Sequence, residues 1–279
     1  MKTYGTPSRA WHDTLDTLTT DDAFTDIITR RVAPRGQPTT EINGPWGFRI
    51  LNPDVMPIAA EGREFRHAIT AAEGLSLVGQ TSIPEIVVDR VGAFRKFLKS
   101  SVFWGAYGPR VAGDIGNVVE LLKKDPDSRQ AVLTIFDADR DLGRTDQLDL
   151  PCTVAIQFLL REGSLEMFVT MRSNDVWLGL PYDLGQFAML QAAVAQSLGV
   201  GMGTYTHVAG SMHLYDRDRE KAAAVAYDEP RDPIRMPWWG ADDIGTIARR
   251  ARRILLGQTT TDLDHMTDFE YWLTEALWG

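Results

Sequence analysis

The spacing of apolar and polar residues predicts helices on either side of a group of strands. Residues 114–124 have helical spacing, with Asp114 as the expected N-cap and an apolar stripe made of Ile115, Val118, Val119 and Leu122. Residues 184–198 predict a second helix, which ends at Gly199 and turns inward Phe187, Leu190, Val194 and Leu198.

The middle third of the chain has the pattern of strands. Three segments, 131–136, 154–160 and 165–171, have strand character, and Glu162-Gly163 between the last two predicts a hairpin turn. A further strand is expected over 204–215, followed by a helix over 216–225. This pattern predicts an α+β fold, and the absence of repeats or an obvious linker predicts a single domain over residues 1–279.

Composition and charge narrow the functional classes. With 279 residues, 44% of them hydrophobic, the chain can bury a large core without disulfides. No run reaches the roughly 18 apolar residues that span a bilayer, and no signal peptide is evident, so a cytoplasmic protein is expected. The net charge of −9 disfavours nucleic acid and anionic membranes as partners. A solvated helix face is expected for Arg249, Arg250, Arg252 and Arg253.

Cys152 is the only cysteine in the sequence and the candidate nucleophile. A thiolate attacks carbon readily, and a single cysteine cannot form an internal disulfide. The five histidines show no spacing with Cys152 or with one another that is typical of zinc ligands, so no metal is expected. The glycine-rich run 199–203 follows a helix rather than a strand and lacks the context of a dinucleotide-binding loop.

Five motifs occur in order around Cys152. They are Asp125-Pro126-Asp127-Ser128-Arg129, Leu150-Pro151-Cys152, Arg172-Ser173-Asn174-Asp175, Leu178-Gly179-Leu180-Pro181-Tyr182-Asp183 and Gly210-Ser211-Met212-His213-Leu214-Tyr215. Together they resemble the thymidylate synthase family over at least residues 107–215, and more loosely from Arg35. The resemblance implies a central mixed sheet flanked by helices, a homodimer packed sheet to sheet, a pyrimidine nucleoside monophosphate as substrate and 5,10-methylenetetrahydrofolate as co-substrate.

The same resemblance implies roles for single residues. Cys152 would add to carbon 6 of the pyrimidine and so make carbon 5 nucleophilic, with Arg172 favouring its thiolate. Tyr107 and Glu73 would be further catalytic residues, Glu73 organising water beside the base, although its match is offset by about one residue from the family spacing. The expected folate contacts are Asp175 and Trp104.

The remaining implied residues bind the nucleotide. Guanidinium groups match phosphate oxygens, and Arg129 would reach the phosphate from the partner subunit. The full expected phosphate set is Arg35, Arg129, Arg172 and Ser173. His213 and Tyr215 would hold a sugar hydroxyl, and Asn174 would also contact the substrate.

The resemblance implies that Asp183 is both a further catalytic residue and the substrate-binding residue that chooses the base. Thymidylate synthases have asparagine there, which accepts from uracil N3–H and donates to O4, whereas a carboxylate accepts from the exocyclic amine of cytosine. This residue marks the cytidylate and deoxycytidylate 5-hydroxymethylase branch, which includes phage enzymes and enzymes of mildiomycin-type antibiotic pathways. The sequence therefore predicts conversion of CMP or dCMP to the 5-hydroxymethyl nucleotide, with a preference for CMP.

Several positions depart from the family pattern. The tryptophan-rich segment is shortened to residues 103–107, which favours capture of the intermediate by water rather than by hydride. Other departures are Gln130, Thr153, Ser211 and a divergent C-terminal region at 271–279. Two alternatives stay open: a thymidylate synthase acting on dUMP, and a nucleotide-binding homologue without catalysis.

Overall fold

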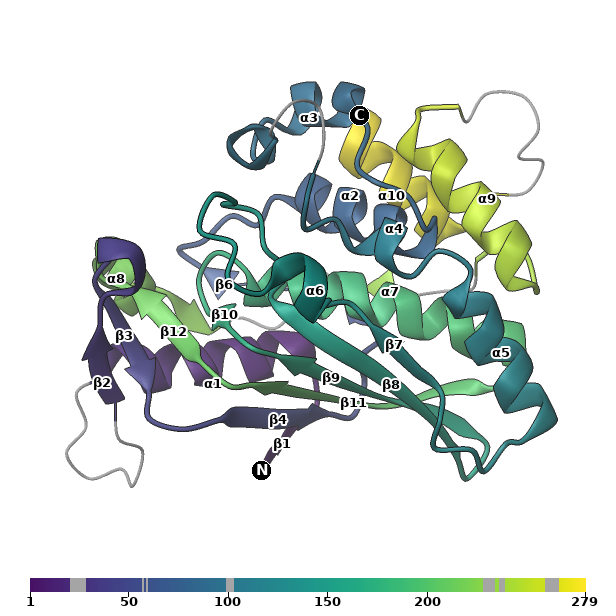
Figure 1. Cartoon of the computed structure of the whole chain (residues 1–279), viewed down its shortest axis with the longest axis horizontal. Coiled ribbons are helices and arrows are strands. Elements are labelled where there is room, and N and C mark those ends of the chain that lie inside the picture. Colours follow the sequence, from purple (N-terminus) through teal and green to yellow (C-terminus); the bar gives the residue numbers. More distant parts are fainter. Residues whose placement is uncertain are drawn as a thin grey trace.

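One mixed sheet carries most of the helices on one of its faces (Figure 1). The computed structural model describes residues 1–20, 29–56, 58, 60–98, 103–227, 234–235, 239–258 and 266–279. The sheet has the strand order β1-β4-β11-β9-β8-β7. Its strands are β1 Lys2–Tyr4, β4 Trp46–Ile50, β7 Val132–Thr134, β8 Thr153–Arg161, β9 Ser164–Met171 and β11 Gly201–Ala209. The described part of the chain thus has the α+β architecture that the sequence predicts.

The register of the sheet follows from one hairpin and one parallel pairing. β8 and β9 are antiparallel, and Glu162 and Gly163 between them both have positive φ, 50° and 75°, so the predicted hairpin turn is confirmed. β9 pairs in parallel with β11, which is antiparallel to β4. Residues Leu165, Met167, Val169 and Met171 of β9 are buried, whereas Phe168 between them is 38% exposed. The sheet therefore has one covered and one open face.

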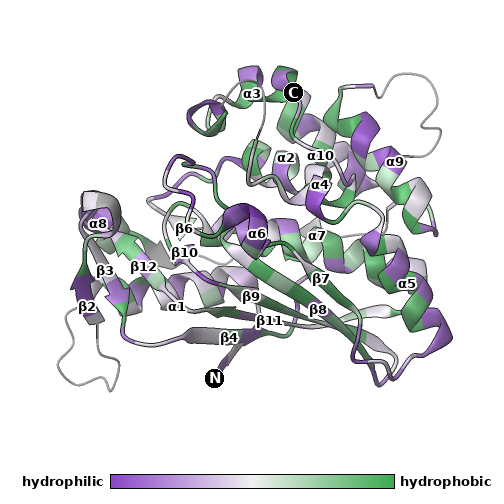
Figure 2. Ribbon diagram, in the orientation of Figure 1, coloured by the Kyte–Doolittle hydropathy of each residue, from purple (hydrophilic) through white to green (hydrophobic). Residues whose placement is uncertain are grey.

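Helix α7, Leu180–Leu198, covers the inner face of the sheet and is buried almost throughout. Helix α2, His67–Val78, packs on it, and a Cβ at Gly74 of α2 would lie 2.2 Å from the sulfur of Met189 on α7. In Figure 2 apolar colouring appears on α7 and β8 and also on α2, α9 and α10. Further helices are α1 Pro7–Thr19, α3 Glu85–Val91, α4 Tyr107–Arg110, α5 Asp114–Lys124, α6 Ala138–Asp141, α8 Arg219–Ala223, α9 Ile244–Leu255 and α10 Asp268–Trp278.

A second sheet stands beside the first and carries part of the site. Its order is β10-β12-β3-β2, with β10 Asn174–Asp175, β12 Met212–Tyr215, β3 Thr39–Ile42 and β2 Thr29–Val32. Two small pairs join β6 Ala60–Glu61 to β13 Ala226–Tyr227 and β5 Val55–Met56 to β14 Ile234–Arg235. The short 3-10 helices are Pro34–Gly36, Arg95–Phe97 and Asp216–Asp218.

Several sequence predictions of element boundaries need correction. Helix 114–124 has the predicted bounds and a buried stripe, but its N-cap is Gly113 in a left-handed conformation, not Asp114. Helix α7 begins four residues earlier than predicted, and Gly199 ends it as expected. The predicted strand over 204–215 is two strands, because the chain bends at 210–211 and β12 then pairs with β3 and β10 instead of the main sheet. The helix predicted over 216–225 is confined to α8 after a 3-10 turn.

The prediction of a wholly solvated arginine face on α9 is wrong. The side chain of Arg250 is only 11% exposed and pairs with the fully buried Glu270 of α10, with 2.6 Å between Nη2 and Oε2. Arg252 donates from Nη1 to the carbonyl of Gly79 at 2.8 Å. Arg249 is exposed, as predicted. These bonds attach α9 to α10 and to the end of α2, so the polar side of α9 also faces protein.

Candidate active site

Cys152 lies immediately before β8, beside the end of β9. The backbone N–H of Arg172 donates to the Cys152 carbonyl at 2.9 Å, which brings the two residues side by side. The guanidinium of Arg172 donates to the carbonyls of Pro151 and Leu150 at 2.9 and 3.3 Å, and its Nη2 lies 4.0 Å from the Cys152 sulfur. The expected pairing of the thiol with this arginine is thus present in the structure.

The surroundings of the thiol nevertheless favour its protonated form. Burial raises the pKa of Cys152 to about 11, and the charge of Arg172 only partly offsets that rise. The negative charges of Asp183, Asp149 and Asp175 add to it. Arg172, one of the arginines expected to favour the thiolate, therefore does not by itself offset the burial of Cys152.

Asp183 sits in the first turn of α7, 8% exposed, and accepts a hydrogen bond on each oxygen. Asn174 donates from Nδ2 to Oδ2 at 2.6 Å, and Gln186 donates from Nε2 to Oδ1 at 2.8 Å. Burial raises the pKa of Asp183 to about 7, although both amide donors oppose the rise. Its carboxyl group therefore changes charge near neutral pH, in a position fixed from two sides.

Glu73 reaches the same region from α2. Burial raises the pKa of Glu73 to about 8, and the nearby charges of Asp183 and then Asp149 add to the rise. Contact between α2 and α7 brings these carboxyl groups together, although 110 residues of sequence separate them. A carboxyl group that exchanges its proton near pH 8 is suited to general acid and base chemistry at neutral pH.

Tyr107 begins α4 and closes another side of the group. Its hydroxyl accepts from the backbone N–H of Thr153 at 3.3 Å, and its ring stacks on Phe187 with centroids 6.3 Å apart. Burial, followed by the charges of Cys152 and Asp183, raises the pKa of Tyr107 well above its ordinary value. The phenol therefore stays protonated beside the residue that follows the nucleophile.

The two sugar candidates, His213 and Tyr215, and one folate candidate, Asp175, lie on the smaller sheet. β10 and β12 run parallel, so that Asp175 is paired with His213. Asp175 accepts from the backbone N–H groups of Trp177 and Leu178 through Oδ1 at 2.8 and 2.9 Å. This leaves its Oδ2 as an acceptor for a ligand N–H, and burial raises its pKa. His213 is 8% exposed, and its Nδ1 has no partner among the described residues, which suits a sugar hydroxyl.

The other predicted residues lie at the margin of this group, further along the sheet, or outside the described part of the structure. The carbonyl of Arg129 accepts from Gln157, five residues or about 16 Å along the strand from Cys152. Ser173 lies between β9 and β10, half-buried. Tyr215 ends β12, with the Arg217 guanidinium 4.3 Å from its ring. Arg35 lies in the 3-10 helix Pro34–Gly36, and its side chain is outside the described part of the structure.

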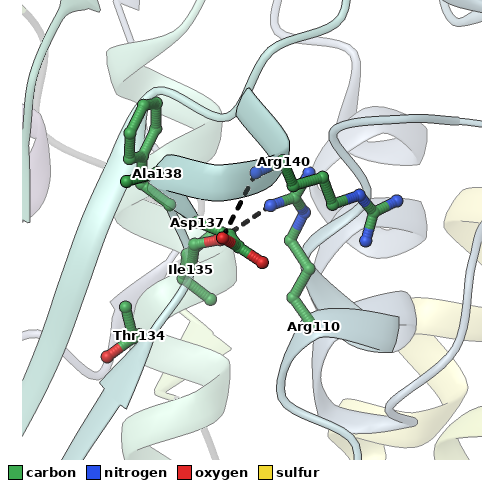
Figure 3. A pocket seen from close by; sticks show the side chains of 7 residues that line it. Arg110, Thr134, Ile135, Asp137, Ala138 and Arg140 are labelled. Atoms are coloured by element: carbon green, nitrogen blue, oxygen red, sulfur yellow. Dashed lines mark hydrogen bonds between the residues drawn. The ribbon is translucent and has the colours of Figure 1, made fainter. Parts of the chain in front are cut away.

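Trp104 is held by contacts of its own. Its Nε1 donates to Asp141 at 2.9 Å, and the guanidiniums of Arg140 and Arg144 lie 4.7 and 4.8 Å from its ring. Asp141 also forms a buried ion pair with Arg110 at 2.7 Å. A cavity of about 470 Å³ adjoins this pair, and in Figure 3 Arg110 points toward Ile135, whose carbonyl accepts from Nη1 at 2.9 Å. The residues that line it are Arg110, Thr134, Ile135, Phe136, Asp137, Ala138 and Arg140, which do not include Cys152 or Asp183.

Three residues of the site were missed from the sequence. The negative charge of Asp149 raises the pKa of the Cys152 thiol. Its position three residues before Cys152 in the sequence could have indicated that it lies near the nucleophile. Gln186 lies three residues after Asp183, the spacing that puts two side chains on one side of a helix. His207 forms a hydrogen bond to Asn174 through Nε2 at 2.9 Å. This contact joins β11 to β10, and no local sequence pattern predicts it.

Comparison with known proteins agrees with this geometry. Residues 94–243, more than half of the chain, match the family described as thymidylate synthase. The chain belongs to the thymidylate synthase family. It is also similar to a deoxyuridylate hydroxymethyltransferase of Bacillus phage SP01, 31% identical over 226 residues, an alignment that covers 75% of this chain and 57% of the phage protein. The chain thus spans little more than half the length of this relative.

Family membership makes sense of the grouped residues. Enzymes of the thymidylate synthase type use methylenetetrahydrofolate as co-substrate. Among the described residues, no cluster of three or more histidine, cysteine or carboxylate side chains is arranged to hold a metal ion. Within the same ranges, no helix has the length and apolar character to cross a membrane. The matched segment contains Cys152, Arg172, Asp183 and Tyr215, whereas Glu73 on α2 precedes it.

Proposed function

We propose that this protein is a pyrimidine nucleotide 5-hydroxymethyltransferase that acts on CMP or dCMP with methylenetetrahydrofolate and water. The observation that carries the choice of base is the carboxylate of Asp183, which both Asn174 and Gln186 approach as donors. Each of its oxygens keeps a free lone pair, so the group presents acceptors to a bound base. An exocyclic amine of cytosine satisfies such an acceptor, whereas uracil O4 is opposed by it.

Cys152 is the proposed nucleophile. Its thiolate forms a bond to carbon 6, and the ring electrons move toward carbon 5, which bonds to the one-carbon unit and then loses its proton. Bound methylenetetrahydrofolate supplies this unit at the oxidation level of formaldehyde. After tetrahydrofolate leaves, water adds to the exocyclic methylene group, and the sulfur of Cys152 departs from carbon 6. The products are then the 5-hydroxymethyl nucleotide and tetrahydrofolate, with no net oxidation or reduction.

Glu73 and Tyr107 are the proposed proton-handling groups. A pKa of about 8 lets Glu73 carry a proton to and from water beside the base at neutral pH. The phenol of Tyr107 keeps its proton and is held by Thr153 next to the nucleophile. The proposed nucleotide contacts are Arg172 and Ser173 for phosphate, with Arg35, and His213 and Tyr215 for the sugar. Asp175 and Trp104 are the proposed folate contacts, since Asp175 keeps one oxygen for a ligand N–H.

A homodimer is part of the proposal. The open face of the sheet carries the row Val132, Gln157, Phe168, Thr206 and Arg49, in which Val132 and Phe168 are 43% and 38% exposed. Exposed apolar side chains among polar ones on an uncovered sheet face are suited to pack on a second copy of the chain. Arg129 lies too far along the sheet to reach its own Cys152, which agrees with a role in the partner's site.

The test compares four nucleotides with the purified protein and methylenetetrahydrofolate. CMP, dCMP, UMP and dUMP are supplied separately, products are identified by mass, and dihydrofolate is followed by absorbance. We expect hydroxymethylated CMP or dCMP without dihydrofolate, with CMP preferred. Methylated dUMP with stoichiometric dihydrofolate would identify a thymidylate synthase instead. A nucleotide-binding homologue would bind nucleotide without releasing tritium from carbon 5.

A second candidate is hydroxymethylation of a uracil nucleotide. It is favoured by the name of the phage relative, whose activity is directed at deoxyuridylate. A protonated Asp183 has one donor and one acceptor and so complements uracil as asparagine does. The four-nucleotide comparison at pH 6 and pH 8.5 separates the two candidates. The first predicts that cytosine turnover dominates at pH 8.5, where Asp183 is ionised. The second predicts that uracil turnover dominates at both pH values, because the bound uracil edge holds the proton on Asp183.

A further inference from the structure

A continuous chain of buried hydrogen bonds ends on Asp183. The hydroxyl of Tyr205 lies 2.8 Å from His207 Nδ1, and His207 Nε2 lies 2.9 Å from Asn174 Oδ1. Asn174 in turn donates from Nδ2 to Asp183 at 2.6 Å. The four residues are 0%, 0%, 2% and 8% exposed, so water does not compete for these contacts. The chain links β11, β10 and α7.

The bond directions are consistent along the whole chain, from Asp183 to Tyr205. Asp183 accepts, so the NH₂ group of Asn174 faces it and the amide oxygen faces His207. Nε2 of His207 must then carry the proton, and Nδ1 accepts from Tyr205. Burial lowers the pKa of His207 to about 3, so the ring has a single N–H to give. Phe48 stacks on the ring, with centroids 5.3 Å apart and an 11° interplanar angle, which opposes its rotation.

We propose that Tyr205, His207 and Asn174 are positioning residues that hold Asp183 as an acceptor toward the base and thereby favour a cytosine edge over a uracil edge. The inference rests on the proposed function and deepens it. A reversed Asn174 amide would present its oxygen to Asp183, which then needs a proton on that side. That proton is directed at Asn174 and not at the base, so Asp183 would lose its negative charge and with it the strong acceptor that the cytosine amine needs. Reversal would also put the His207 proton on Nδ1, and the phenol of Tyr205, which has no other acceptor among the described hydrogen bonds, would leave its own buried proton unpaired. Tyr205 therefore opposes the reversal from β11.

Tyr205→Phe tests the chain of hydrogen bonds, because it removes the hydroxyl group and keeps the aromatic ring. The Nδ1–H tautomer of His207 then no longer leaves a buried phenol proton unpaired, so the preference for the Nε2–H tautomer is weakened. We expect the ratio of kcat/KM for CMP to that for UMP to fall about five- to tenfold, the scale of one mismatched buried hydrogen bond. Carbon-5 tritium release from CMP persists, because Cys152 is untouched. Tyr4→Phe is the matched control, because Tyr4, like Tyr205, is a buried phenol that donates a hydrogen bond. Its acceptor is Asp13, which is not part of the chain that ends on Asp183.

Nitrogen NMR of ¹⁵N-histidine-labelled protein gives a readout that a merely structural role does not move. We expect the His207 proton on Nε2 in the wild type and in Tyr4→Phe, and a mixture of tautomers in Tyr205→Phe. A wild-type proton on Nδ1, or an unchanged nucleotide ratio in a folded Tyr205→Phe protein, overturns the relay. A wild type that prefers uracil nucleotides overturns the proposed function. In that case a changed tautomer and a changed ratio in Tyr205→Phe still support control of Asp183 by Tyr205.

Discussion

Asp183→Asn exchanges one acceptor of the proposed base site for a donor. The wild-type carboxylate serves Asn174 and Gln186 with one oxygen each, but an asparagine has only one oxygen. Its NH₂ group must therefore face one of the two amides. Asn174 is anchored by His207, whereas Gln186 has no comparable anchor among the described hydrogen bonds. We expect Gln186 to reverse its amide and the new NH₂ group to direct its second hydrogen at the base.

The magnitude follows from one mismatched buried hydrogen bond, which costs about 1–3 kcal/mol, or roughly 5- to 150-fold. In the wild type this cost falls on uracil O4, and in Asp183→Asn it falls on the cytosine amine. In Asp183→Asn the kcat/KM for CMP should fall and that for UMP should rise. The ratio of the two should therefore fall by about two orders of magnitude. Loss of the titrating carboxyl group should also remove the change in selectivity between pH 6 and pH 8.5.

The assay measures initial rates of tetrahydrofolate-dependent product formation with CMP and UMP, at both pH values. Asp149→Asn is the matched control: it removes another raised-pKa carboxyl group that faces Cys152, but one that the proposal does not place against the base. A nucleotide ratio that is unchanged in Asp183→Asn, or changed equally in Asp149→Asn, would refute the role of Asp183 in selecting the base.

The remaining predictions concern chemistry and stability. Cys152→Ala should abolish carbon-5 tritium release while nucleotide binding by calorimetry persists; residual release at the wild-type rate excludes it as nucleophile. Glu73 has a folded pKa of about 8 against an ordinary 4.5, so the stability linked to its proton is fully present below pH 4.5 and is lost as the pH rises toward 8. Glu73→Gln should flatten this decline in the free energy of unfolding, measured by urea titration at a series of pH values. An unchanged dependence of the unfolding free energy on pH contradicts the shift. Gly108→Ala should cost about 3 kcal/mol or more, because its Cβ would lie 2.3 Å from two backbone oxygens, whereas Gly116→Ala meets nothing within 4 Å and should not destabilise; equal melting temperatures would contradict this. Asp141→Asn should cost about 3–5 kcal/mol by leaving its buried arginine unpaired, and a loss below 1 kcal/mol would show that the pair is dispensable.

Local patterns predicted the elements that local interactions decide. The helix at 114–124 and the turn at Glu162-Gly163 depend on residues a few positions apart, and both have the expected bounds. The prediction of one strand over 204–215 was wrong, because strand pairing sets where a strand ends. Apolar residues continue beyond the bend at 210–211, but β12 pairs with β3 and β10 and not with the main sheet. The prediction of a solvated arginine face on α9 was wrong for a similar reason, because the partner of Arg250 is Glu270, 20 residues further along the chain.

The order of motifs in the sequence determined the family, the nucleophile Cys152 and its neighbour Arg172, because these residues lie in short segments whose chemistry can be read without a fold. Only the tertiary structure decided the state of these groups. Packing of α2 on α7 brings the Glu73 carboxyl group near that of Asp183, and burial raises both pKa values toward neutrality. The sheets bring Tyr205 and His207 into line behind Asn174. Protonation and hydrogen-bond direction depend on burial and on partners distant in sequence, and these exist only once the chain has folded.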